Sequence, residues 1–198
     1  MRTYAQWPGP LSVAGWLDAL KKGRTYYSSG PLLEFTVNGK APGEQIELPA
    51  GGGKVRIEGK VWSWAPLTHA IVHSNGAIFR ELPLRRPADG SAGLVAEFSE
   101  EGEVKDSRWF TLYAEGGYTQ LLDVNYPQAS TNAVRVIVGG RPLRDRQSAE
   151  YFVQWIDKLS GMAAQWPWWR SEKEKAHVLG QFREARAIWE KRASEAGE

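Results

Sequence analysis

Residues 68–82, THAIVHSNGAIFREL, decide the fold class of this chain. Two apolar runs rich in β-branched residues flank Asn75-Gly76. Asn-Gly between such runs is the strongest short-range signal for a β-hairpin, because both residues tolerate the positive φ angles of a tight turn. The stretch therefore predicts two antiparallel strands joined by a two-residue turn.

Apolar and polar residues also alternate with a period of two on both sides of this hairpin. In LLEFTVNG (32–39), Leu33, Phe35 and Val37 share one face. The same alternation recurs in KVRIEGKVW, GLVAEFSEEGE, SRWFTLYAEGG and AVRVIVGGRPL. Short strands with a turn signal about every ten residues are typical of an antiparallel β-sandwich of the immunoglobulin-like type. We therefore expect a mainly β fold of this class.

The glycine-rich stretches are predicted to be turns. Residues 23–44, GRTYYSSGPLLEFTVNGKAPGE, place Gly-Pro, Asn-Gly and Pro-Gly around a strand, which is turn chemistry. In PAGGGKVRIE (49–58), Leu48 stands where a phosphate-binding loop needs its first glycine, and Val55 follows the lysine. Such a loop opens a helix, whereas a strand follows here. Neither stretch is predicted to bind a ligand.

The two ends of the chain are predicted to be helical. Ser12 can cap a short helix with an apolar stripe at Val13, Trp16, Leu17 and Leu20. Near the C-terminus, SAEYFVQWIDKL (148–159), with Ser148 as its N-cap, and SEKEKAHVLGQFREARAIWEKR (171–192), with a Ser171–Glu174 capping box, predict two more helices. Their stripes are Phe152, Trp155, Ile156, Leu159, Val178, Phe182, Ala185 and Trp189.

The expected domain organisation follows from these patterns. Residues 1–146 form the β-sandwich with its N-terminal helix, and residues 147–198 form a C-terminal helical pair. Two short helices cannot bury their apolar stripes alone, so we expect the pair to pack on the sandwich as one structural unit.

Composition excludes several classes of function. Lys and Arg number 25 against 23 Asp and Glu, a net charge of +2 with the signs interspersed, so no nucleic-acid partner is expected. The absence of cysteine excludes disulfides and thiolate chemistry. No apolar run approaches the roughly 20 residues that span a bilayer, so no membrane partner is expected. We expect a soluble protein. The sequence does not specify its compartment, and export as part of a longer parent protein is one of the options.

No catalytic residue and no metal ligand is predicted. His69 and His73 have the i, i+4 spacing that binds zinc on a helix, but on a strand they would lie about 13 Å apart. Their β-branched neighbours favour a strand. No serine lies in a G-x-S-x-G elbow.

The ten tryptophans are the most unusual feature of the composition. Trp16, Trp155 and Trp189 fall on helical stripes and are expected in the core. Trp62 and Trp64 share one face at the end of a predicted strand, so they are candidates for a stacking platform. A second candidate cluster, at a corner around Pro167, consists of Trp166, Trp168 and Trp169. Core or interface packing is the alternative for both clusters.

The order of these segments resembles the C-terminal β-domain of CehA/McbA-type metal-dependent hydrolases, enzymes built on a polymerase-and-histidinol-phosphatase (PHP) barrel. The matching text is GPLSVAGWLDALKKGRTYYSSGPLLEFTVNGKAPGE (9–44), SRWFTLYA (107–114), ASTNAVRVIVGGRPL (129–143) and SAEYFVQWIDKL (148–159). The chain departs from the pattern at Ser130 and Ala133, where many relatives have a histidine and a proline. The family's His-x-His metal ligands match no position here.

The resemblance implies a non-catalytic accessory domain that docks on and supports a catalytic barrel. The partner would be that barrel, in cis. No cofactor is expected in this chain, and the divalent metal of the parent enzyme would lie in the barrel. The alternative is a stand-alone module that binds a carbohydrate or a small aromatic ligand through exposed tryptophans. A complete small enzyme is the third and least favoured interpretation.

Overall fold

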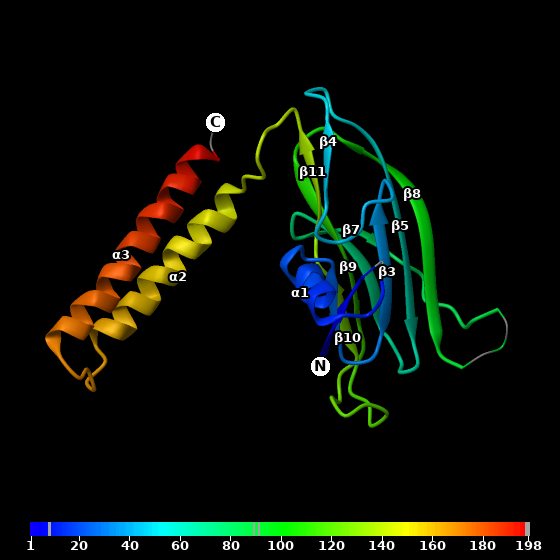
Figure 1. Ribbon diagram of the computed structural model, residues 1–198, viewed down its shortest axis with the longest axis horizontal. Helices are drawn as coiled ribbons and strands as arrows, with labels where there is room; N and C mark the ends of the chain where they lie inside the picture. Colours follow the sequence, from blue (N-terminus) through cyan, green and yellow to red (C-terminus); the bar gives the residue numbers. More distant parts are fainter. Residues whose placement is uncertain (8, 89, 91, 197–198) are drawn as a thin grey trace. The chain divides into compact units, whose positions relative to one another are not determined.

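The computed structural model describes residues 1–7, 9–88, 90 and 92–196, which form two compact units, Met1–Pro142 and Leu143–Glu198 (Figure 1). The boundary between them lies close to the predicted one at residue 146. The packing of the helical pair on the sandwich as one structural unit stays a prediction. No helix in the described part of the chain is both long and apolar enough to cross a membrane.

The first unit contains one helix and eleven strands, in the order β1 (Arg2–Ala5), α1 (Val13–Lys21), β2 (Thr25–Ser28), β3 (Leu32–Val37), β4 (Gln45–Leu48), β5 (Gly53–Ser63), β6 (His69–Ser74), β7 (Ala77–Glu81), β8 (Leu94–Val104), β9 (Arg108–Glu115), β10 (Gln128–Thr131) and β11 (Val134–Val138).

These strands form two sheets. The smaller sheet has the order β3-β5-β8 and is antiparallel throughout. The larger one runs β1-β2-β10-β9-β11-β4, and the β6–β7 hairpin joins it by pairing β6 with β9. One pairing, β4 with β11, is parallel, so the larger sheet is mixed where a purely antiparallel one was expected.

The core lies between the two sheets and confirms the predicted mainly β, sandwich fold. Phe110 and Leu112 of β9 are fully buried together with Val55, Ile57 and Val61 of β5. The predicted inward residues of β3 are also buried. Because successive side chains on a strand point to opposite faces, the period-two pattern was enough to identify this core.

The β6–β7 hairpin forms as its sequence predicts. Asn75 and Gly76 have φ angles of 48° and 80°, the left-handed conformation that a tight two-residue turn requires. Asn75 also ties the turn to β9, because its side-chain oxygen accepts a hydrogen bond from the Trp109 amide at 3.0 Å.

The apolar stripe predicted to be the buried face of helix α1 is wrong. Ser12 caps the helix as expected, but Val13, Trp16 and Leu17 are exposed, and the buried positions are Gly15 and Ala19. The indole of Trp7 occupies the space above Gly15, where a Cβ atom would lie 2.4 Å from the ring. Small residues allow this close approach, and so the face with the smallest side chains is the buried one.

The second unit is a helical hairpin of α2 (Arg146–Ala164) and α3 (Glu172–Glu195). Ser171 caps α3 as predicted, but the cap of α2 is Asp145, whose carboxylate accepts a hydrogen bond from the Ser148 amide. Ile156 is buried, whereas Trp155 is 43% exposed and is not the core residue expected. The Trp189 ring is half-buried and stacks on Phe152.

Candidate ligand-binding surface

Trp62 lies on the outer face of the three-stranded sheet. It points away from the core because its neighbours Val61 and Ser63 are buried. The strand register places Leu32 of β3 and Val95 of β8 directly beside it. Leu32 is exposed and Trp62 and Val95 are half-buried, so the three side chains form an apolar row across one end of the sheet.

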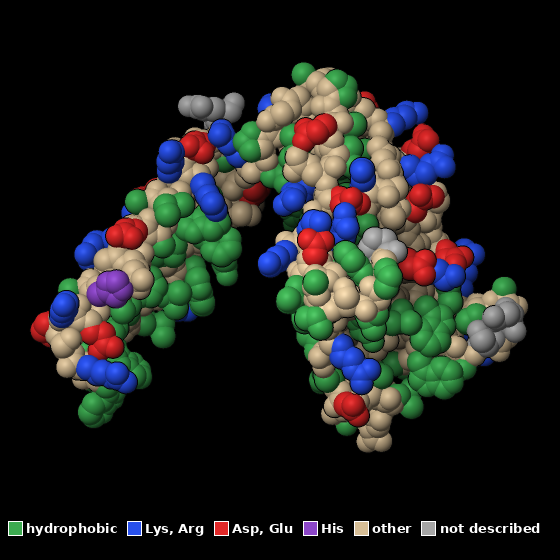
Figure 2. Space-filling model, viewed as in Figure 1, with side chains coloured by type: hydrophobic (Ala, Val, Ile, Leu, Met, Phe, Trp, Pro, Cys, Tyr) green, Lys and Arg blue, Asp and Glu red, His purple; other side chains and the backbone are tan. Residues whose placement is uncertain are grey.

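Trp64 is the residue that follows β5. It is 58% exposed, and it lines a cavity of about 560 Å³. The other lining residues are Pro66, Arg86, Pro87, Gly90, Ala92, Gly93 and Leu94. Figure 2 shows apolar side chains gathered at this end of the sandwich, near the end of β5 and the start of β8 in Figure 1. The volume lies within the roughly 300–1,000 Å³ of typical small-molecule sites.

Local hydrogen bonds fix the peptide that carries Trp64. The buried Ser63 hydroxyl donates to the carbonyl of Ala65 at 2.7 Å and so shapes the bend after the strand. Gly93 has a φ of 112°, and a Cβ atom there would lie 2.6 Å from the Ser63 carbonyl oxygen. Only glycine therefore lets the β7–β8 connection lie against this bend.

The opposite wall of the cavity is tied to the edge of β8. Arg85 and Val95 exchange two backbone hydrogen bonds, at 2.8 and 2.7 Å, which places Arg86 at the cavity. The site thus combines one indole face, two prolines and one guanidinium group. Flat apolar surface with a few polar groups is the composition of small-ligand sites in general.

Further along β5, the outer face of the same sheet is charged. Lys60 pairs with Glu97 at 2.5 Å, and hydrogen bonding to that carboxylate raises the pKa of Lys60. Lys54 and Arg56 both lie within ion-pair distance of Glu101. The cations of β5 therefore have carboxylate partners, and the apolar row around Trp62 follows them along the strand.

The corner tryptophans of the helical unit are arranged differently from one another. Trp166 and Trp168 are 56% and 78% exposed. Trp169 is half-buried, and its indole N–H donates to the Ala163 carbonyl at 2.9 Å, which closes the turn between α2 and α3. Trp169 thus has a structural role in this turn.

The histidines lie where the strand interpretation predicts. His69 and His73 are both on β6. His69 contacts the Glu81 carboxylate at 2.7 Å, and the His73 ring lies against Tyr113. Within the described ranges, no group of three or more His, Cys, Asp or Glu is placed to hold a metal ion.

Sequence reasoning singled out Trp62 and Trp64, of which Trp64 lines the cavity, but not the other walls of the cavity. Arg86, Pro87 and Gly93 lie in a segment rich in Gly, Pro and Arg that predicts only a loop. Their approach to Trp64 depends on tertiary pairing between residue 85 and residue 95, which has no local signature.

Comparison with known proteins does not assign the chain to a family. No protein-family model matches the chain, and no curated protein matches it.

Proposed function

We propose that the β-sandwich unit is a recognition module that binds a sugar ring or a small aromatic ligand in the cavity beside Trp64. The observation that supports this most is the exposure of Trp64 on the wall of that cavity. A large aromatic side chain left uncovered at a concave site is a common feature of ligand-binding surfaces.

The chemistry of the cavity suits such a ligand. The flat indole face packs against the apolar face of a sugar ring or against an aromatic ring. Arg86 carries five N–H donors that match hydroxyl or carboxylate oxygens of the ligand. The apolar row of Leu32, Trp62 and Val95 lies at the same end of β5 and offers a second apolar surface for a ligand longer than one ring.

The test is a binding screen with matched variants. Soluble oligosaccharides and small aromatic compounds are screened with the full chain, and hits are measured by calorimetry. Trp64→Ala is expected to weaken binding about tenfold or more, because Trp truncation at binding hot spots commonly costs at least this much. Trp168→Ala, which removes an equally large exposed ring from the helical unit, serves as the control. Equal affinity of both variants would contradict the proposal.

A second candidate function is the accessory domain of a PHP-type hydrolase. The resemblance over residues 9–44 supports it, and so do the uncovered apolar side chains of α1, Val13, Trp16 and Leu17, with Leu11 just before the helix. An uncovered apolar patch marks a protein contact surface more often than a solvated one. The partner would be the catalytic barrel with its divalent metal.

Co-expression with a PHP barrel encoded next to or upstream of this chain tests the second candidate. A stable complex that Trp16→Ser and Leu17→Ser weaken would support docking through α1. Trp64→Ala serves as the control, because Trp64 lies in the connection between β5 and β6, outside α1. A barrel that purifies without the chain would contradict this role.

A further inference from the structure

We infer that the sandwich carries a second site, a basic pocket that binds a tetrahedral oxyanion such as a phosphate or sulfate group. Its residues come from the end of α1, from the turn before β4 and from β11. The cavity measures about 420 Å³ and is lined by Lys21, Lys22, Arg24, Gly43, Glu44, Gln45 and Arg135. The inference is independent of the aromatic cavity.

Gly43 allows the three segments to pack closely against one another. Gly43 has a φ of 86°, and a Cβ atom there would lie 2.0 Å from the Lys22 carbonyl oxygen. The Gly43 amide donates to the carbonyl of Ala133 at 2.8 Å, and the Arg135 amide donates to the carbonyl of Glu44 at 3.0 Å. Backbone is thus packed on backbone, so the side chains around the pocket start from fixed positions.

Four cations share this pocket with one lining carboxylate. Arg24 lies 3.6 Å from Glu44, longer than the roughly 2.7–2.9 Å of a tight charge-assisted hydrogen bond. Glu44 is also held by the Ala41 amide at 2.8 Å. Lys22 pairs with Asp18. Among the described residues, Lys21 and Arg135 have no carboxylate within ion-pair distance.

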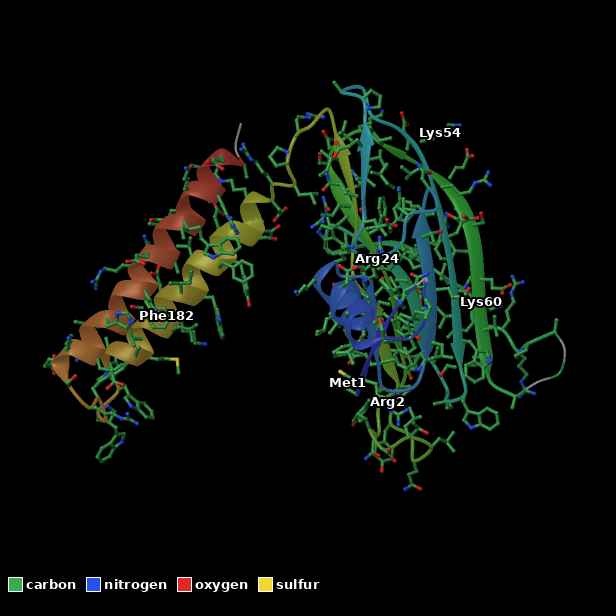
Figure 3. All side chains as sticks on the ribbon, viewed as in Figure 1. Met1, Arg2, Arg24, Lys54, Lys60 and Phe182 are labelled. Atoms are coloured by element: carbon green, nitrogen blue, oxygen red, sulfur yellow. The ribbon has the colours of Figure 1, made fainter. Side chains whose placement is uncertain are left out.

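This excess of positive charge contrasts with the outer face of β5. On β5 the outward cations Lys54, Arg56 and Lys60 all have glutamate partners on β8. Figure 2 shows Lys and Arg side chains gathered on the sandwich near α1, and Figure 3 places Arg24 there, away from Lys54 and Lys60 beside β8. The net charge of only +2 makes such a local concentration notable.

Helix capping does not account for all four cations. Lys21 and Lys22 lie at the C-terminal end of α1, where positive charge interacts favourably with the helix dipole. Arg24 and Arg135 lie outside that helix: Arg24 directly precedes β2, and Arg135 is on β11. The guanidinium groups of Arg24 and Arg135 and the ammonium group of Lys21 line one pocket, and they can supply the bidentate and point-charge contacts that phosphate and sulfate prefer.

The experiment is an NMR titration of the full chain with inorganic phosphate, and separately with sulfate, against sodium chloride at constant ionic strength. Saturable shifts are expected for the amides of Gly23, Arg24, Gly43 and Glu44. The double variant Lys21→Gln/Arg135→Gln is expected to weaken binding about tenfold, since each lost charge removes a charge-assisted contact. Both side chains are exposed, so the fold should survive, and the spectrum itself checks this.

The matched control is Lys54→Gln/Arg56→Gln, which also removes one lysine and one arginine. Its affinity is expected to change by less than about twofold, because those charges lie beyond the range of direct contact and are screened. Saturation by either oxyanion at the named amides, with loss only in the pocket variant, supports the site. Shifts scattered over other basic residues, or equal weakening in both variants, would overturn it.

Discussion

At the residue scale, the hydrophobic pattern predicted the burial of strand residues correctly, but it failed at some tryptophans and at close contacts made by glycines. Alternation placed Val55, Ile57 and Val61 in the core, because strand side chains alternate strictly between two faces. The same logic failed for Trp16, since α1 is buried through Gly15 and Ala19. A stripe of large side chains predicts burial only where no close backbone approach competes with it.

Gly43→Ala is expected to lower the free energy of unfolding by about 2–5 kcal/mol, because the new methyl group meets the Lys22 carbonyl and the backbone is strained at positive φ. Gly39→Ala is the control: its φ is 70°, but no atom lies within 4 Å of the added Cβ, so only the conformational cost of about 1 kcal/mol applies. Equilibrium urea unfolding measures both. Equal losses would show that the contact at Gly43 contributes nothing.

Thr131→Val is expected to destabilise the sandwich by about 1–3 kcal/mol, since it leaves a buried amide without its acceptor. The Thr131 hydroxyl accepts a hydrogen bond from the Leu112 amide at 2.9 Å, and both residues are buried. Thermal or urea unfolding gives the difference. Thr36→Val, at a half-buried position of β3, is the comparison, and a loss as large as that of Thr131→Val would contradict the assignment.

At the scale of elements, the long strands and the hairpin were predictable, and the short strands were not. β6 and β7 flank an Asn-Gly turn, and β5 and β8 are eleven residues each, long enough for alternation to show. β1, β2, β4 and β10 have four residues each. So few residues give no periodic signal, and such strands depend on their neighbours for hydrogen bonds and burial.

The N-cap of α2 should make the start of this helix sensitive to pH. Hydrogen bonds from Ser148 hold the pKa of Asp145 below its ordinary value. A carboxylate with a lowered pKa stabilises the fold above its unfolded pKa, and that stabilisation is lost as pH falls through the folded pKa. Amide exchange at Ser148 is therefore expected to accelerate at acidic pH, after correction for the intrinsic rate.

Asp145→Asn is the control for this effect, because asparagine caps a helix without titrating. Its Ser148 exchange should not show the acidic acceleration. Asp145→Ala should lose protection at every pH, by about 1 kcal/mol. If Ser148 exchange in Asp145→Asn accelerates at acidic pH as it does in the unmodified chain, the role of the carboxylate is contradicted.

Helix α2 also exposes an aromatic stripe. Tyr151, Trp155 and Met162 are uncovered at spacings of four and seven residues, so they lie along one side of the helix. A peptide of residues 143–198 is expected to self-associate, with helix content that rises with concentration. Circular dichroism over a dilution series measures this. Trp155→Gln/Met162→Gln should reduce the dependence, and helix content independent of concentration would contradict the expectation.

At the scale of the whole molecule, the boundary between the units was predictable because the hydrophobic period changes there from two to that of a helix. The core cluster consists entirely of residues from Met1–Pro142. Residues 1–142 alone are therefore expected to unfold cooperatively, and this is checked by differential scanning calorimetry. A broad transition without an enthalpy peak would show that the sandwich needs the helical unit to fold.

The ligand site required the tertiary structure. Strand alternation places Trp62 on the outer face of β5, but the cavity beside Trp64 exists only because Gly93 allows the β7–β8 connection to lie against the Ser63–Trp64 peptide. The basic pocket likewise joins Arg24 with Arg135, 111 positions along the chain, through the Gly43 turn. Sequence patterns report local periodicity, and both sites are made by contacts between distant segments.

The central claim, that Trp64 is the contact surface of a ligand, is tested most directly by the indole N–H resonances of the ten tryptophans. The Trp64 resonance is assigned by its disappearance in Trp64→Phe. During titration with a ligand from the binding screen, we predict a saturable shift of this resonance, while those of Trp155 and Trp168 stay in place. A Trp64 resonance that does not move while the ligand saturates the protein would contradict the proposed function.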